Sequence, residues 1–146
     1  MAGWALLLLV LGLALALLGA SAAAARYGGW SALGRDYPAR RAIIGERFRH
    51  VTALMGEEGT AVLYGGSLSV TIGDEGIGLS AGFPQVLSCP PLFVPWRAVA
   101  TVQARQTVLA SEALIRLHGR DKVIRLRGSV AICALRTWAR VGSPSD

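Results

Sequence analysis

The chain has 146 residues, a hydrophobic content of 53% and a formal net charge of +6. That length allows one modest domain, and the hydrophobic fraction is high for a soluble protein. Two cysteines exclude a disulfide-stabilised scaffold. Cys89 and Cys133 allow one disulfide in an oxidising compartment and are expected to be small buried thiols in a reducing one.

Residues 1–25 are predicted to form a transmembrane anchor. Residues 4–25 carry no charge and include nine leucines. A helix of that length rises about 33 Å, which matches a hydrocarbon core of roughly 30 Å. The leucines contribute about −3 to −5 kcal/mol to insertion. Trp4 at one end, and Tyr27 and Trp30 at the other, are typical of aromatic anchors at the membrane interface.

The charge flanking this segment predicts its orientation. No Lys or Arg precedes it, whereas six arginines follow closely: Arg26, Arg35, Arg40, Arg41, Arg47 and Arg49. The positive-inside rule then places the N-terminus outside and the domain in the cytoplasm. Fourteen of the fifteen basic residues are arginine, a bias that indicates either a GC-rich bacterial genome or a need for bidentate contacts to carboxylate or phosphate. The expected location is a bacterial inner membrane.

A cleaved secretory signal is the alternative to an anchor. The small residues around 19–25 are similar to a signal-peptide cleavage site after a leucine-rich core. Cleavage would release a periplasmic β-domain protein. The missing positive charge before the apolar run favours the anchor, because secretory signals normally begin with a basic region.

Residues 26–45 are predicted to be a juxtamembrane connector of mixed Gly, Arg and aromatic residues. Trp30, Leu33 and Tyr37 have i, i+3, i+7 spacing, which predicts a short helical turn with one apolar face. That face is expected to lie either against lipid headgroups or against the domain.

Residues 46–146 are predicted to form a small, mainly β domain. Alternating polar and apolar positions indicate seven short strands, at residues 47–55, 60–72, 77–81, 92–94, 97–107, 111–118 and 122–128. Gly65-Gly66 indicates a bulge or sharp bend. Residues 129–141 contain no Gly or Pro and predict a closing helix capped by Ser129. Its apolar stripe comprises Val130, Leu135, Trp138 and Val141.

A partly open barrel or roll of about seven strands with a C-terminal helix resembles the plan of pleckstrin-homology-like domains. In that plan the helix plugs an open end of the barrel, and Trp138 is the expected plug. The resemblance lies in the order of elements, so an SH3-like or other small β-roll stays an alternative.

A more specific pattern is "GIGLSAGFP" followed by "CPPLFVPWRAV". It resembles a pattern of small bacterial single-pass membrane proteins without an established activity, in which a G-L-x-L-S strand precedes H-P-P-L-x-I-P-W. The matching residues are Gly78, Leu79, Ser80, Pro90, Pro91, Leu92, Pro95 and Trp96. Cys89 stands at the usual His position and Val94 at the usual Ile. The resemblance therefore implies architecture and topology, and no histidine chemistry.

The prolines of this segment predict where its short strand lies. Pro90, Pro91 and Pro95 lack an amide donor, so they belong at an edge or crossover. Phe93 lies between them, and Trp96 follows as a large apolar wedge. The segment is expected either to pack into the core or to offer an edge to a partner.

No residues in the sequence form a catalytic constellation, so we expect no enzyme, no cofactor, no metal and no small-molecule substrate. His50 and His118 have no neighbouring cluster of Cys, Asp or Glu. Asp74 and Glu75 are predicted to be solvated residues of a hairpin turn.

The best functional candidate is a basic cluster formed by Arg116, Arg120, Lys122, Arg125 and Arg127. Arg116 on one predicted strand faces the same way as Arg125 and Arg127 on the next. An acidic partner or an anionic headgroup would suit this patch, and a solvated face is the plain alternative. Nucleic acid is disfavoured because the cluster has no interleaved aromatics.

These features predict a non-enzymatic accessory or scaffolding subunit. Its anchor and small domain would dock on a larger respiratory, photosynthetic or transport assembly, with other membrane protein subunits as partners. A module that binds anionic lipid headgroups is the alternative function.

Overall fold

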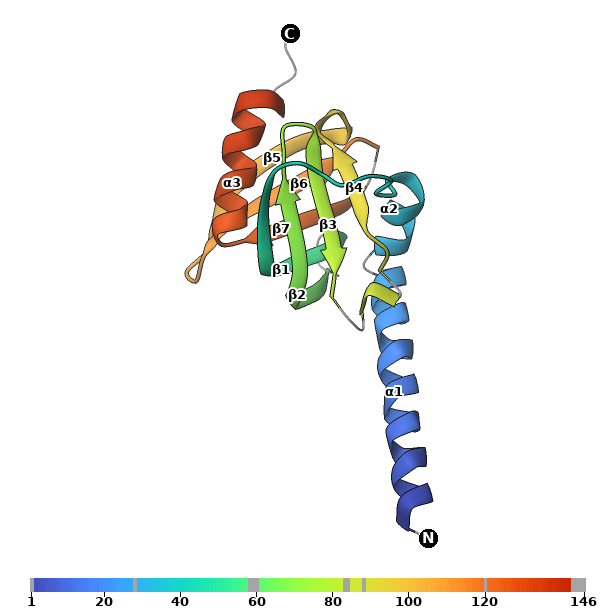
Figure 1. Ribbon diagram of the computed structural model, residues 1–146. Helices are drawn as coiled ribbons and strands as arrows, with labels where there is room; N and C mark the ends of the chain where they lie inside the picture. The colour runs from blue at the N-terminus through green and yellow to red at the C-terminus, as the bar shows by residue number, and fades with distance from the viewer. Residues whose placement is uncertain are drawn as a thin grey trace.

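The computed structural model describes residues 2–27, 29–57, 61–82, 85–87, 89–119 and 121–142. A long N-terminal helix leads to a curled half-barrel of seven antiparallel strands, against which a C-terminal helix packs (Figure 1). This arrangement confirms the predicted fold.

The helices are α1 Ala2–Tyr27, α2 Trp30–Asp36 and α3 Ser129–Thr137. The strands are β1 Glu46–Glu57, β2 Val62–Ile72, β3 Gly76–Ala81, β4 Leu92–Pro95, β5 Val99–Gln106, β6 Ser111–Leu117 and β7 Lys122–Arg127. Two 3-10 turns, η1 Gln85–Leu87 and η2 Trp96–Ala98, and a π-helical turn, η3 Trp138–Gly142, accompany them.

The sheet bends along β1, which joins its two halves. The strand order is β4-β3-β2-β1-β7-β6-β5. The first half of β1 pairs with β2 alone, whereas residues 53–57 also pair with β7. Register shifts interrupt the β1–β2 ladder near His50 and Gly66, whose φ angles are 54° and 68°. These bulges bend the sheet into a front layer, β2 to β4, and a back layer, β5 to β7, as Gly65-Gly66 predicted.

The core lies between the layers and is closed by α3. Val130, Ala131 and Ala134 form the buried stripe of this helix. Trp138 packs on Trp96, with 5.8 Å between the ring centroids. Trp138 thus fills the open end of the half-barrel, as expected.

Two expectations for the closing helix are wrong. Gly128, with φ of 86°, is the N-cap, and Ser129 is already the first helical residue without a capping hydrogen bond. Glycine adopts this positive φ without steric cost. Val141 is 39% exposed because the wider π-helical turn η3 rotates the last residues away from the α-helical stripe.

The short helix α2 packs on the domain. Trp30 is 0% and Leu33 2% exposed, and both belong to the core cluster. The Trp30 indole N–H donates to the carbonyl of Pro90 at 2.8 Å, and its ring centroid lies 5.4 Å from that of Tyr64. Of the two surfaces expected for this apolar face, the domain is the one it contacts. The prediction that Trp30 is an interfacial anchor is therefore wrong, because its side chain is enclosed by protein.

Strand β4 lies at an edge of the sheet, as its prolines predicted, but this edge is covered. The Phe93 amide donates to the carbonyl of Tyr37 at 2.9 Å, and the Ala39 amide donates to the carbonyl of Pro91 at 3.2 Å. Pro38, between these two connector residues, forms a bridge to the strand. The edge expected to receive a partner is thus occupied by the chain's own connector.

Candidate functional site

The outer face of the back layer collects arginine side chains. Arg125 lies opposite Leu114 across the β6–β7 ladder, and Arg116 lies opposite Val123. Residues opposite each other in an antiparallel pair share a face, and alternate residues of one strand do too. Arg116, Arg125 and Arg127 therefore lie on one face, as the sequence predicted.

A fourth arginine, Arg105 of β5, joins this face. Arg105 lies opposite Glu112 of β6, which in turn lies opposite Arg127 of β7. We call the surface formed by Arg105, Arg116, Arg125 and Arg127 the arginine face. The sequence analysis missed Arg105, because its facing depends on the register between β5 and β6.

Of the other members of the predicted cluster, only Lys122 can be placed. Lys122 occupies the opposite face of β7, where its aliphatic chain packs against the backbone of Gly29. Arg120 lies outside the described residues. The functional cluster therefore differs from the predicted one by the loss of Lys122 and the gain of Arg105.

Glu112 sits at one end of the arginine face. Its side chain is almost fully buried, and it accepts a hydrogen bond from Arg127 Nε at 2.6 Å. It is the only acidic residue within strands β5, β6 and β7. The four arginines and one glutamate that these strands contribute to the face make it predominantly basic, with Arg105 and Arg127 exposed and Arg116 and Arg125 half-buried. The Glu112–Arg127 pair is charge-assisted and holds one guanidinium in a defined geometry.

The arginine face points across the direction of α1. In Figure 1 the axis of α1 runs down the picture, while β5, β6 and β7 cross behind β2 and β3. The inner side of this back layer faces the core, so its outer side faces away from the viewer. If α1 crosses a membrane, the arginine face looks sideways along the membrane plane.

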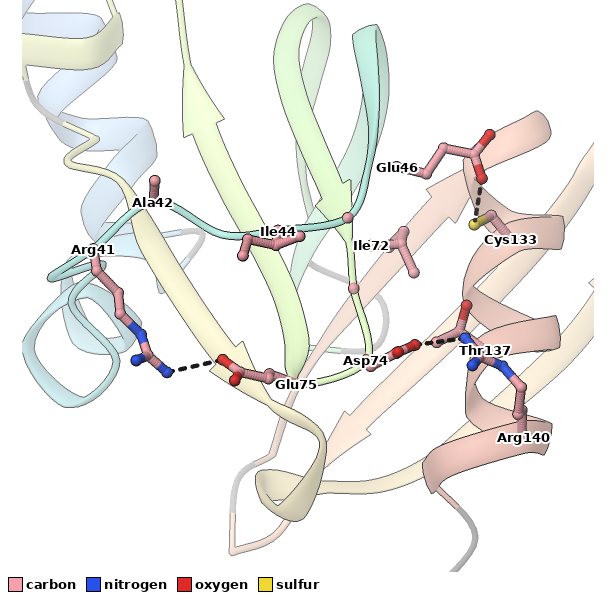
Figure 2. Close-up of a pocket in the computed structure, with 12 residues that line it drawn as sticks. Arg41, Ala42, Ile44, Glu46, Ile72, Asp74, Glu75, Cys133, Thr137 and Arg140 are labelled. Carbon is pink, nitrogen blue, oxygen red and sulfur yellow. Dashed lines mark hydrogen bonds and ion pairs between the residues drawn. The ribbon is translucent and has the colours of Figure 1, made fainter.

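An open cavity of about 540 Å³ lies at the end of the sheet far from α1, between the connector, the β2–β3 turn and α3 (Figure 2). Arg41 pairs with Glu75 at 2.9 Å, and Arg140 pairs with Asp74 at 2.5 Å. Figure 2 shows the two carboxylates turned toward opposite walls. Asp74 and Glu75 are exposed turn residues, as predicted, and they do not face each other as an acid/base pair.

Both cysteines are free thiols. Burial raises the pKa of Cys89 to about 11. Burial also raises the pKa of Cys133, and the carboxylate of Glu46, which accepts a 3.4 Å hydrogen bond from Cys133 Sγ, raises it further. Nucleophilic chemistry needs the thiolate, so at neutral pH the two thiols act as packing groups.

The remaining candidates divide between core and surface. Trp96 is buried and its indole N–H donates to the carbonyl of Gly73 at 2.8 Å, so its expected role as a partner contact is wrong and its role as a core wedge holds. Pro90 and Pro91 are exposed, and Phe93 is half-buried. Pro90 and Pro91 supply carbonyls to Trp30 and the connector.

The histidines are not brought together with other ligands. His50 Nδ1 lies 3.3 Å from the carbonyl oxygen of Gly66, and His118 is exposed at the start of the β6–β7 turn. Within the described ranges, no three His, Cys, Asp or Glu side chains form a group that could hold a metal ion.

A second functional feature is the joint between α1 and the domain. α1 is long and apolar enough to span a membrane, with a mean hydropathy of 2.5 over an 18-residue stretch within Gly3–Arg26. Its last turns contact the domain: Ala25 is buried, and the Tyr64 hydroxyl donates to the carbonyl of Ala24 at 3.0 Å. Burial raises the pKa of Tyr64, so this hydroxyl stays a donor.

Tyr64 also packs on Trp30 at the start of α2, so this one residue of β2 contacts both helices at the joint. Trp4, predicted as the anchor at the other end, is 77% exposed near the start of α1. The side chain of Tyr27 lies outside the described part of the chain.

No protein-family model matches this chain, and no curated protein sequence matches it either.

Proposed function

We propose that this protein is a non-enzymatic accessory subunit of a bacterial inner-membrane assembly. In this proposal α1 stays in the membrane, the domain lies on the cytoplasmic side, and the arginine face binds an acidic surface of a neighbouring membrane protein. The observation that carries the proposal is the arginine face itself: four arginines and one buried glutamate on a rigid sheet.

The chemistry of this face suits carboxylates. Arginine has a planar guanidinium that forms two parallel hydrogen bonds to a carboxylate or phosphate. Strands hold their side chains at fixed spacing, so the positive charges meet a partner without a loop having to become ordered. Complementary charges of this kind contribute to specificity and to the rate of association more than to affinity.

The direction of the face supports a protein partner over lipid headgroups. The joint formed by Ala24, Tyr64 and Trp30 holds the sheet against α1, and the arginine face looks across the axis of α1 (Figure 1). A surface that looks along the membrane plane meets the sides of neighbouring proteins. The headgroups lie beneath the domain, in a different direction.

A photo-crosslinking amino acid at Gln103 tests the proposal. Gln103 is exposed and lies opposite Leu114, on the arginine face. Illumination of intact cells is expected to give one stoichiometric protein adduct, whose crosslinked peptide is rich in Asp and Glu. The same amino acid at Ser69, on the outside of β2 in the front layer, is the control and should give no such adduct.

Charge reversal completes this test. Arg105→Glu should lower the yield of the Gln103 adduct at least tenfold at physiological salt, and Arg97→Glu, an equal change outside the face, should leave it unchanged. A lipid adduct at Gln103 would replace the proposal by headgroup binding. A mature chain without residues 1–25, or an active periplasm-dependent reporter enzyme fused after residue 142, would overturn the anchored cytoplasmic arrangement.

A further inference from the structure

The exposed part of α1, before the helix reaches the domain, is shorter than the hydrocarbon core of a membrane is thick. Residues 3–17 are exposed, and partial burial begins at Leu18 and recurs at Ser21 and Ala24. Residues 3–17 rise about 22 Å at 1.5 Å per residue, whereas the hydrocarbon core is about 30 Å thick. A spanning α1 must therefore place about one and a half more turns, which already touch the domain, within the apolar layer.

The turn η1 is the part of the domain that lies beside these turns. It packs against α1, and Figure 1 shows it next to the helix, on the side of the sheet from which α1 leaves. Its two described side chains are aliphatic: Leu87 is 65% and Val86 37% exposed. The described protein leaves these parts of both side chains uncovered, although each is large enough for full burial to be favourable.

We propose that η1 inserts Val86 and Leu87 into the apolar edge of the bilayer beside α1, as a second membrane contact of the domain. The occupant of this surface is lipid acyl chain, because the missing 8 Å or so of span brings the hydrocarbon boundary to the level of η1. This contact fixes the height and rotation of the domain. The inference rests on the anchoring of α1 in the proposed function, and it is independent of the arginine face.

The chain offers a matched control for this contact. Ile44 is also an exposed aliphatic residue, at 93%, but it lies at the other end of the sheet, beside Gly73 in the β2–β3 turn. Tyr64 marks the α1 end of β2 and Ile72 its far end, a separation of about 26 Å at 3.3 Å per residue. Ile44 therefore stands well clear of the membrane.

Nitroxide-lipid quenching distinguishes the two positions. The full chain with Cys133→Ser carries Leu87→Cys or Ile44→Cys, labelled with the polarity-sensitive dye NBD and reconstituted in phosphatidylcholine vesicles. Cys89 is kept because it is buried, and the parent Cys133→Ser chain must stay unlabelled. Lipids with the nitroxide near the top of the acyl chain are expected to quench the dye at residue 87 at least threefold more than at residue 44, with a blue-shifted emission at residue 87.

Equal quenching at the two positions, with a native near-ultraviolet spectrum for both proteins, overturns the inference. Val86→Cys is a second site should Leu87→Cys fail to fold, and the same criterion applies to it. Failure of the proposed function has a different signature: alkaline extraction would release the chain from the vesicles, or mass analysis of the cellular protein would show residues 1–25 missing. Retention of α1 without quenching at residue 87 removes only the insertion of η1.

Discussion

Trp30 provides a direct test of how the connector and the domain are joined. We expect Trp30→Ala to destabilise the domain by about 3–5 kcal/mol, the range for a fully buried tryptophan. Trp30 is fully buried, packs on Tyr64 and donates to the carbonyl of Pro90. Because small domains are stable by about 5–15 kcal/mol, this loss is about a fifth of the total or more.

Trp30→Phe separates the two contributions. Phenylalanine keeps an aromatic ring beside Tyr64 but leaves the Pro90 carbonyl without its donor, so we expect a loss of about 1–2 kcal/mol. Trp4→Ala is the control: its ring is exposed on α1, and a change in domain stability within about 0.5 kcal/mol is expected.

The measurement is urea unfolding in a mild detergent, followed by the near-ultraviolet circular dichroism of the Trp96–Trp138 pair. The slope of the unfolding free energy against urea concentration should be the same for all variants, which shows that only stability has changed. If Trp30→Ala shifts the midpoint no more than Trp4→Ala does, the packing of the connector in the core is refuted. A chain starting at residue 46, which lacks Trp30 and Leu33, is expected to show no cooperative transition.

Three further outcomes are expected. Glu112→Gln should lower the unfolding free energy by about 1–2 kcal/mol, because it leaves Arg127 without its anionic acceptor. In thermal unfolding, the fall in melting temperature caused by this substitution should be smaller at high salt. Cys89 should resist maleimide at neutral pH and react once urea is added. Its pKa is raised to about 11, so its contribution to stability is complete below pH 9 and is lost as the pH rises toward 11, where the unfolded state gives up the proton first. Gly66→Ala should cost about 1 kcal/mol, because φ is 68° and open space surrounds the added Cβ; Gly65→Ala, equally open and without a positive φ, is the matched control, and equal losses of melting temperature would contradict the argument.

Local alternation was sufficient to predict β2 and β3, because apolar residues at every second position, from Leu68 to Ile72 and from Ile77 to Ala81, are buried in the core. The prolines around Phe93 likewise predicted an edge strand. What covers that edge could not be predicted, since the amide of Phe93 finds its acceptor in Tyr37, more than fifty residues away. The helical spacing of Trp30 and Leu33 fits headgroups and core equally well, so the choice depends on tertiary contacts.

For the arginine face too, one part could be predicted from local sequence and another part depends on tertiary structure. The β6–β7 hairpin made the common facing of Arg116 and Arg125 predictable, because residues on neighbouring strands alternate together. Arg105 depends on the turn between β5 and β6, which has no Gly, Asn or Pro to mark its length. That turn is closed by Thr107, whose hydroxyl donates to the carbonyl of Ala110 at 2.8 Å. A side-chain closure of this kind sets the register without a recognisable turn sequence.

The pairing of β1 with β7 also sets the order in which the protein can fold. Residues 55 and 124 lie opposite each other, so the half-barrel closes only after the chain has been synthesised as far as β7. Contacts between such distant residues form slowly, because a long loop must close before they do. By then α1 has long since emerged from the ribosome, and β1 to β4 wait beside it with an unpaired edge along β1. Until β7 arrives, that edge is the place where this chain is most exposed to aggregation.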